Sequence, residues 1–337
     1  MKTWVRLVLA ICLGASLLLF IRATDLQKVI NAIQQVGYQF ILLLLITLMA
    51  YFFGTLSWQY CLGNSSRNIF TGNLFLIRHV GETVSLINPA SIIVGETVKV
   101  FLLNNHKIEK NTAIASIFVS RIIMIITQLL LFTAALAVLL ANKHNLNLEL
   151  NNRGILLVLI VILVLAVPLM IFRERLRIVI LKTRAGTYLK VRSANWRFKM
   201  KEVRTEIFVL VQQHKKQIFL ALLFAAIHWI LGSLEFFFIL KFLGIKITMI
   251  KALVVDMGVI FFKSAGAFIP GQIGIEEYGN KIMLAAIGIP GTEIWITASI
   301  LRRARQMVWI AVGIGIYWLL FKNQRIINRN GNTLRHT

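Results

Sequence analysis

The sequence predicts an all-helical integral membrane protein, and three observations lead to that prediction. Apolar residue types make up 58% of the 337 residues, and charged types make up only 15%. A soluble domain has about 45–50% apolar and about 25% charged residues, so one soluble core could not bury this apolar surface. Several stretches also reach the roughly 20 apolar residues that a helix needs to cross a bilayer. The same composition excludes disorder and a disulfide-stabilised secreted scaffold.

Six stretches are long and apolar enough to predict spanning helices, at residues 4–21, 39–61, 112–141, 154–172, 216–240 and 294–321. The first is similar to a secretory signal peptide, because Lys2 and Arg6 precede its apolar run. No convincing small-residue cleavage site follows it, so we expect this segment to be retained as the first helix.

Two further apolar segments, 74–103 and 251–287, are interrupted near their middle by proline, glycine and charged residues. Proline removes a backbone donor and breaks a helix, and lipid cannot satisfy the carbonyl groups that are freed. We therefore expect two broken or re-entrant helical segments whose breaks are buried in protein or line a wet cavity. The residues that mark these breaks are Pro89, Gly95, Pro270, Gly271 and Gly274.

The formal net charge of +24 is concentrated in a basic insertion at about residues 173–216. Basic loops of membrane proteins face the cytoplasm. This rule places the insertion and both termini in the cytoplasm, provided that each broken segment returns to the side that it left. We interpret the insertion as an anchor on anionic lipid rather than a nucleic-acid-binding surface. It is also too short to form a separate enzyme domain.

An internal repeat relates the two broken segments. A proline, a glutamate and an arginine recur with the same spacing and one offset of 181 residues, as Pro89, Glu96 and Arg121 and then as Pro270, Glu277 and Arg302. The predicted topology makes the units 39–141 and 216–320 enter the membrane from opposite sides. Inverted repeats with discontinuous helices are typical of secondary transporters.

Two arginines, Arg121 and Arg302, are predicted to lie inside spanning helices. Arg121 is about nine residues, or about 13 Å, into its helix. Ionisable groups at such depth are costly and usually functional. The sequence leaves two interpretations open: both arginines bind an anionic phosphate headgroup, or each forms an ion pair, Arg121 with Glu96 and Arg302 with Glu277.

Adjacent carboxylates, Glu276 and Glu277, follow the second break. Neighbouring residues on a helix point about 100° apart, so one of the two should face the cavity, and the repeat favours Glu277. That carboxylate would bind a cationic headgroup or exchange a proton, or else interact favourably with the helix dipole. We add Lys99 and Lys263 to the candidate substrate-binding residues. The repeat matches Lys263 to Glu82, which has the opposite charge.

The remaining ionisable residues have simpler interpretations. Asp256 is expected near the outer interface, in contact with solvent. His228 and Glu235 are seven residues apart on one helix face, and a hydrogen-bonded packing pair is favoured there over a proton relay. Arg303 is expected to make a structural contact. The sequence has no HExxH motif, no Walker motif and no Cys/His ligand spacing, so we expect no metal, cofactor or catalytic residue.

Two stretches carry a family resemblance: IPGQIGIEEYGNKIMLAAIGIPGTEIWITASILRRARQMVWIAVG, beginning at residue 269, and NPASIIVGETVKVFLL, beginning at residue 88. They resemble the signatures of the lysylphosphatidylglycerol synthase transmembrane-region family, also called flippase-like, in which proline, glycine and glutamate precede a basic residue. Lys99 stands where arginine is more usual. The resemblance covers nearly the whole chain. A short tail follows residue 321, without the aminoacyl-transferase domain of bifunctional members, so lysyl transfer is not expected.

The resemblance implies a single flippase-like domain over residues 1–337. It would lie in the inner membrane and move a phosphate-containing lipid between leaflets, either an anionic or aminoacylated phospholipid or a polyprenyl- or hopanoid-type lipid. Self-association stays open. Two alternatives remain. One is a scaffold for a lipid- or glycolipid-synthesis complex that uses the basic insertion, and the other is a membrane enzyme with Glu276 or Glu277 as general base.

Overall fold

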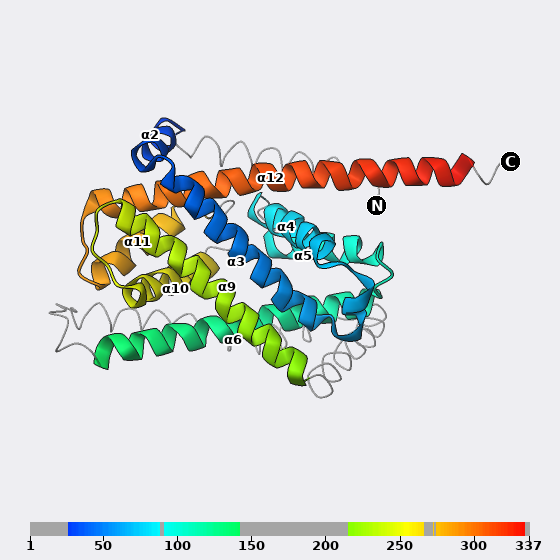
Figure 1. The fold of residues 1–337 in the computed structure, drawn as a ribbon, viewed down its shortest axis with the longest axis horizontal. Coiled ribbons are helices and arrows are strands. Elements are labelled where there is room, and N and C mark those ends of the chain that lie inside the picture. The colour runs from blue at the N-terminus through cyan, green and yellow to red at the C-terminus, as the bar shows by residue number, and fades with distance from the viewer. Residues whose placement is uncertain (1–25, 88–90, 142–214, 266–271, 273, 334–337) are drawn as a thin grey trace, which may run out of the picture.

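The computed structural model describes residues 26–87, 91–141, 215–265, 272 and 274–333, and all of their regular structure is helical (Figure 1). The elements are α2 (Leu26–Val36), α3 (Gln39–Cys61), the 3₁₀ helix η1 (Gly63–Asn68), α4 (Thr71–Ile87), α5 (Ser91–Asn104), α6 (Lys110–Ala141), α9 (Lys215–Phe242), α10 (Met249–Ala265), α11 (Ile275–Ala286) and α12 (Thr292–Thr333). The all-helical prediction is confirmed for this part of the chain. The predicted helices at 4–21 and 154–172, nearly all of the basic insertion, and Pro89, Pro270 and Gly271 lie outside it.

Three of the described helices, α3, α6 and α9, are long and apolar enough to cross a membrane. They coincide with the predicted spans at 39–61, 112–141 and 216–240. Their outer faces expose large apolar side chains, such as Ile41, Leu130 and Phe219, as a helix in contact with lipid requires. The predicted span at 294–321 lies inside α12, a helix of 42 residues that is not among these three.

Both interrupted segments form helical hairpins, in which α4 packs on α5 and α10 packs on α11. In the first hairpin α4 and α5 approach closely at Gly95. A β-carbon there would overlap Ser85 Oγ and the Gly81 carbonyl oxygen, so the approach requires glycine. In the second hairpin Gly274 has a φ of 83° at the start of α11. Glycine adopts this left-handed conformation without steric cost. Of the residues predicted to mark the breaks, Gly274 stands directly before the start of α11, whereas Gly95 lies inside α5 and marks a close helix contact instead of a break.

Helices α3 and α9 lie side by side and run antiparallel across the middle of the molecule (Figure 1). Ser57 Oγ donates a hydrogen bond to the Ala221 carbonyl oxygen at 2.8 Å. Further along the pair, His228 Nδ1 lies 2.7 Å from the Ala50 carbonyl oxygen. Residue numbers thus fall along α9 as they rise along α3. Among the described helices, the order of long helix, hairpin and long helix occurs twice, first as α3–α6 and then as α9–α12.

Two apolar cores surround the two hairpins. One core packs α4 and α5 with the first half of α6, and includes Leu74 and Leu103. The other packs α10, α11 and α12 with α2 and the second half of α6, and includes Phe132 and Phe236. Helices α3 and α9 contribute to both cores, so they connect the two parts of the molecule.

Candidate functional site

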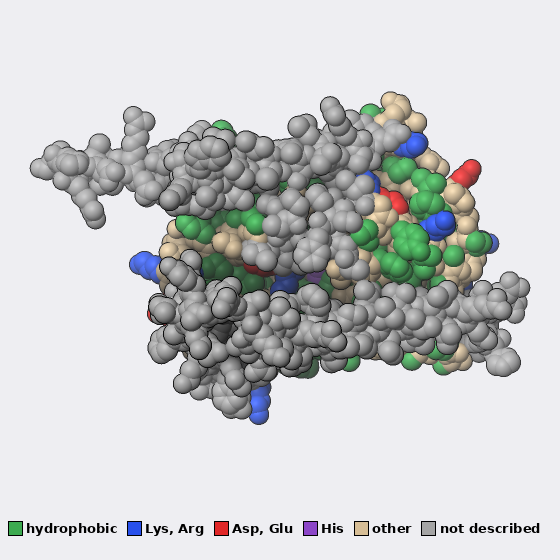
Figure 2. Space-filling view, turned by 180° about the vertical axis from the view of Figure 1, so that it is seen from behind, with side chains coloured by type: hydrophobic (Ala, Val, Ile, Leu, Met, Phe, Trp, Pro, Cys, Tyr) green, Lys and Arg blue, Asp and Glu red, His purple; other side chains and the backbone are tan. Residues whose placement is uncertain are grey.

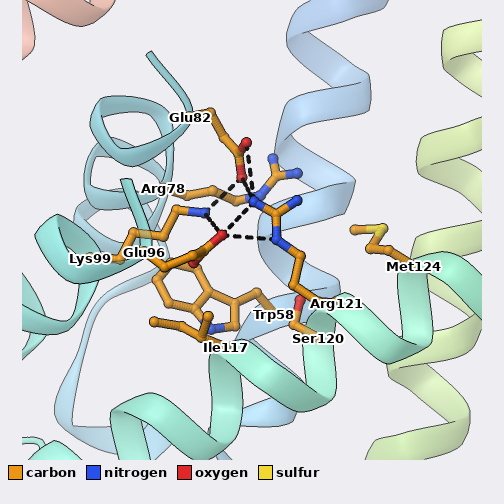
Figure 3. A pocket seen from close by; sticks show the side chains of 9 residues that line it. All are labelled: Trp58, Arg78, Glu82, Glu96, Lys99, Ile117, Ser120, Arg121 and Met124. Atoms are coloured by element: carbon orange, nitrogen blue, oxygen red, sulfur yellow. Dashed lines mark hydrogen bonds and ion pairs between the residues drawn. The ribbon is translucent and has the colours of Figure 1, made fainter. Parts of the chain in front are cut away.

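The first charge cluster comprises Glu82 on α4, Glu96 and Lys99 on α5, and Arg121 on α6 (Figure 3). Lys99 Nζ lies 2.7 Å from Glu82 Oε1 and 3.3 Å from Glu96 Oε1. Arg121 Nε donates to Glu96 Oε1 at 2.8 Å, and Arg121 Nη2 contacts both Glu96 and, at 3.1 Å, Glu82 Oε1. Each cation therefore bridges both carboxylates. The ion pair of Arg121 with Glu96, which is one of the two interpretations that the sequence leaves open, is present. Glu82 also belongs to the cluster, whereas the repeat identifies it only as the counterpart of Lys263.

Arg78 extends from α4 toward this cluster (Figure 3). Its Nη1 atom donates a hydrogen bond to the Tyr51 carbonyl oxygen at 3.0 Å. A β-carbon at Gly54 would lie 2.7 Å from Arg78 Nη2, so the absence of a side chain at Gly54 leaves room for the guanidinium. None of the ion pairs found among the described residues includes Arg78. Sequence reasoning missed this residue, although its spacing of four from Glu82 places both on one helix face.

These side chains line a cavity of about 30 Å³, together with Trp58, Ile117, Ser120 and Met124. That volume is enough for water but not for a phosphate group. Lys99 is 5% exposed and lies 5.7 Å from the centre of the Trp58 ring, whereas Arg121 is 42% exposed. With Arg78 included, three cations face two carboxylates. The first charge cluster is thus partly open and carries an excess of positive charge.

The second charge cluster comprises Asp256 and Lys263 on α10, Glu276 on α11, and Arg302 on α12. Arg302 Nη2 donates to Asp256 Oδ1 at 2.8 Å, and Arg302 Nε lies 3.1 Å from Glu276 Oε1. Lys263 Nζ lies 3.1 Å from Glu276 Oε2. The side chains of Asp256, Glu276 and Arg302 are 2%, 6% and 7% exposed. Here two cations balance two carboxylates, so this cluster is neutral, and its most exposed side chain is that of Lys263, at 22%.

The interpretation in which Arg302 pairs with Glu277 is not observed, because Arg302 contacts Asp256 and Glu276 instead. Of the two adjacent carboxylates, Glu276 is the more buried, at 6% exposed against 22% for Glu277. Glu277 occupies the third position of α11, and its Oε2 atom turns back to accept a hydrogen bond from the Gly274 amide at 2.9 Å. It also forms an ion pair with Arg303, which therefore makes the structural contact expected for it. Because α11 begins at Ile275, Glu276 lies on the face of the helix that contacts Arg302 on α12.

The repeat with its offset of 181 residues matched Glu96 to Glu277, although Glu276 is the carboxylate that contacts the arginine, and this mismatch has a physical reason. The same offset matches Glu276 to Gly95, and the close approach of α4 and α5 leaves no space for a side chain at Gly95. The first hairpin therefore has to place its acid one position later, at Glu96. Lys263 pairs with Glu276 inside its own hairpin, so a contact between Lys263 and Glu82 across the two units is not observed.

Two other expectations are corrected by the packing of α9. Asp256 is buried instead of solvated, and it accepts a hydrogen bond from Ser233 Oγ at 3.1 Å. His228 and Glu235 do not pair with each other. His228 contacts the backbone of α3, and Glu235 Oε1 lies 2.8 Å from Arg305 Nε on α12. Each side chain meets a different neighbouring helix, which the single-helix spacing could not reveal.

Tyr51 on α3 lies between the two clusters. Its carbonyl oxygen accepts the hydrogen bond from Arg78, and its hydroxyl group lies 3.4 Å from Arg305 Nη1 as acceptor. Its ring packs against His79 and Trp309, with ring centres 5.7 and 5.4 Å away. One residue therefore contacts an arginine on each side of the molecule.

Comparison with known proteins identifies the family. Residues 4–315 match the family described as Lysylphosphatidylglycerol synthase TM region. The chain belongs to this family. Family membership and the three apolar helices make it an integral membrane protein with a lipid-related function. Neither the curated proteins nor the solved structures gave a significant match.

Proposed function

We propose that the chain moves a phosphate-bearing lipid between the leaflets of the inner membrane, and that the first charge cluster holds the headgroup. The observation that carries the proposal is the partly open, positively charged cluster among apolar helices. Cations in such surroundings are costly unless they are paired or used for binding. Arg78 and Arg121 present guanidinium groups, which bind phosphate with two parallel hydrogen bonds.

A phosphate would bind by exchange with the carboxylates. Glu82 and Glu96 now contact the Arg121 guanidinium, and the cavity of about 30 Å³ holds no headgroup. Movement of the two carboxylates toward Lys99, which already contacts both, would free Arg121 for the phosphate. The acyl chains would stay in the bilayer while the headgroup passes. The proposed activity is transport without chemical change of the lipid.

The arrangement of helices supports a transporter built from two inverted units. The order of long helix, hairpin and long helix occurs twice among the described helices, and the corresponding helices α3 and α9 run antiparallel. Helices α6 and α12 also run in opposite directions (Figure 1). Within this proposal the hairpins are re-entrant, and both termini and the basic insertion face the cytoplasm, as the basic loops predict.

The two clusters have different roles in this proposal. Arg302 contacts two buried carboxylates from two helices and is only 7% exposed, so a substrate could reach it only if this buried cluster opened. We therefore assign the second charge cluster to holding α10, α11 and α12 together. Arg121, which is 42% exposed, is assigned to the headgroup.

A leaflet-protection assay in proteoliposomes tests the proposal. The panel contains headgroup-labelled phosphatidylglycerol, lysyl-phosphatidylglycerol, phosphatidylethanolamine and a polyprenyl phosphate. The compared proteins are wild type, Arg121→Gln and the control Lys215→Gln, an exposed lysine at the start of α9. A hydrogen bond to a charged group contributes about 1.5–3 kcal/mol, so Arg121→Gln should slow selective flipping by about 10–100-fold.

Two results would contradict the proposal. Equal flipping by wild type and Arg121→Gln would contradict the assignment of the headgroup to the first charge cluster. Absence of flipping for every lipid, with wild-type protein that elutes as a folded species and with an imposed proton gradient, would reject transport. A scaffold or an enzyme on a lipid-linked substrate would then be favoured.

A further inference from the structure

A second cavity lies where the end of α9 meets the start of α10, and none of the residues that line it belongs to either charge cluster. Its volume is about 510 Å³, within the range of about 300–1,000 Å³ that is usual for small-molecule sites. Its lining combines basic, hydroxyl and apolar side chains, including Lys241, Lys246, Lys251, Thr248, Phe237 and Ile247. We call this space the lysine cavity.

The charge around the lysine cavity is unbalanced. No carboxylate of the described residues lines it, and none of the ion pairs found among those residues includes Lys241, Lys246 or Lys251. Three positive charges on one cavity repel one another unless an anion lies among them.

The position of Lys251 adds to this imbalance. The Lys251 backbone amide donates to Thr248 Oγ1 at 3.4 Å, which places Lys251 in the first turn of α10. A helix N-terminus carries partial positive charge and favours anions over cations. A lysine there is unfavourable for the isolated helix and favourable for an anion bound in front of it.

Apolar side chains also line the lysine cavity. Phe237 and Ile247 are two of them, and both pack against the core around the second hairpin. Seen from behind in Figure 2, the end of the molecule that carries α10 and α11 shows basic side chains beside apolar surface. A cavity lined by both basic and apolar side chains is suited to a molecule with an anionic head and a hydrocarbon tail, and it is poorly suited to a free anion.

We propose that the lysine cavity binds the phosphate group of an anionic lipid at the membrane surface, with the first part of an acyl chain against Phe237. The lysines supply charge, Thr248 supplies a hydroxyl donor, and the apolar side chains select a lipid over inorganic phosphate. This site is separate from the first charge cluster and does not depend on transport.

Native mass spectrometry of the full chain in detergent tests this inference. All proteins carry Arg121→Gln, so that binding at the first charge cluster is weakened. The ligands are dioctanoyl-phosphatidylglycerol, dioctanoyl-phosphatidylcholine and inorganic phosphate. The cavity variant replaces Lys241, Lys246 and Lys251 by glutamine, and the matched control replaces Lys110, Lys215 and Lys216. A single Lys246→Gln variant is included in case the triple variant does not fold.

Affinity for phosphatidylglycerol should fall by about tenfold or more in the cavity variant, by a smaller factor in Lys246→Gln, and by less than about twofold in the control. Equal loss in the cavity variant and the control would overturn the proposal. So would displacement of the lipid by inorganic phosphate at the same concentration, because the site would then belong to a free anion. Binding here together with absent flipping would reject the proposed transport and leave the lysine cavity in place.

Discussion

Replacing Arg302 by glutamine should destabilise the protein far more than the same change at Arg121. Arg302 is 7% exposed and contacts two carboxylates that are 2% and 6% exposed. Removing one partner of a buried ion pair costs about 3–5 kcal/mol, because the remaining charge is left uncompensated. Arg121 is 42% exposed, and both of its carboxylates also contact Lys99. An exposed pair contributes about 0–1 kcal/mol.

The difference can be measured by titrating the purified proteins in mixed micelles with dodecyl sulfate and following tryptophan fluorescence. A gap of about 3 kcal/mol in the free energy of unfolding is more than a 100-fold change in the unfolding equilibrium. Transport should show the opposite order per folded molecule, with the larger defect in Arg121→Gln. Equal unfolding midpoints, or a larger loss in Arg121→Gln, would refute the assignment of Arg302 to structure.

Three further changes can be measured in the same titration. Gly95→Ala should cost about 1–3 kcal/mol through overlap with α4, whereas Gly315→Ala, where a β-carbon meets open space, should cost nothing; equal effects would contradict the close helix approach. Glu277→Gln should lower stability by at least about 1 kcal/mol, because it weakens the cap on α11 and also removes the charge that pairs with Arg303, and an unchanged midpoint would argue against both contacts. Tyr51→Phe should cost less than about 1 kcal/mol, because the lost contact to Arg305 is 3.4 Å long; a larger cost would show that the hydroxyl is central to the fold.

Local chemistry predicted much of the fold. Apolar length identified α3, α6 and α9, and the interruptions around Pro89 and Pro270 identified the two hairpins. The contact of Arg121 with Glu96 was one of the two interpretations left open for this arginine, and the structure contains it. These features depend on residues that are close in sequence or on one regular offset.

The sequence could not predict the features that depend on how the helices rotate and pack against one another. Glu276 rather than Glu277 faces Arg302, because that depends on how α11 turns about its own axis after Gly274. Asp256 is buried because α9 and α12 cover it, and hydropathy along one helix carries no information on such partners. Glu82 was within reach of sequence reasoning as a carboxylate in an apolar helix.

Helix α3 connects events on the two sides of the molecule through a single residue. Arg78, beside the first charge cluster, holds the Tyr51 backbone, and Arg305, beside the second, holds its hydroxyl group. Any turn of α3 about its axis would therefore disturb both arginines at once. In the proposed transport, a movement of α3 that opens the first charge cluster would also shift the Tyr51 hydroxyl group relative to Arg305 in the other half of the molecule.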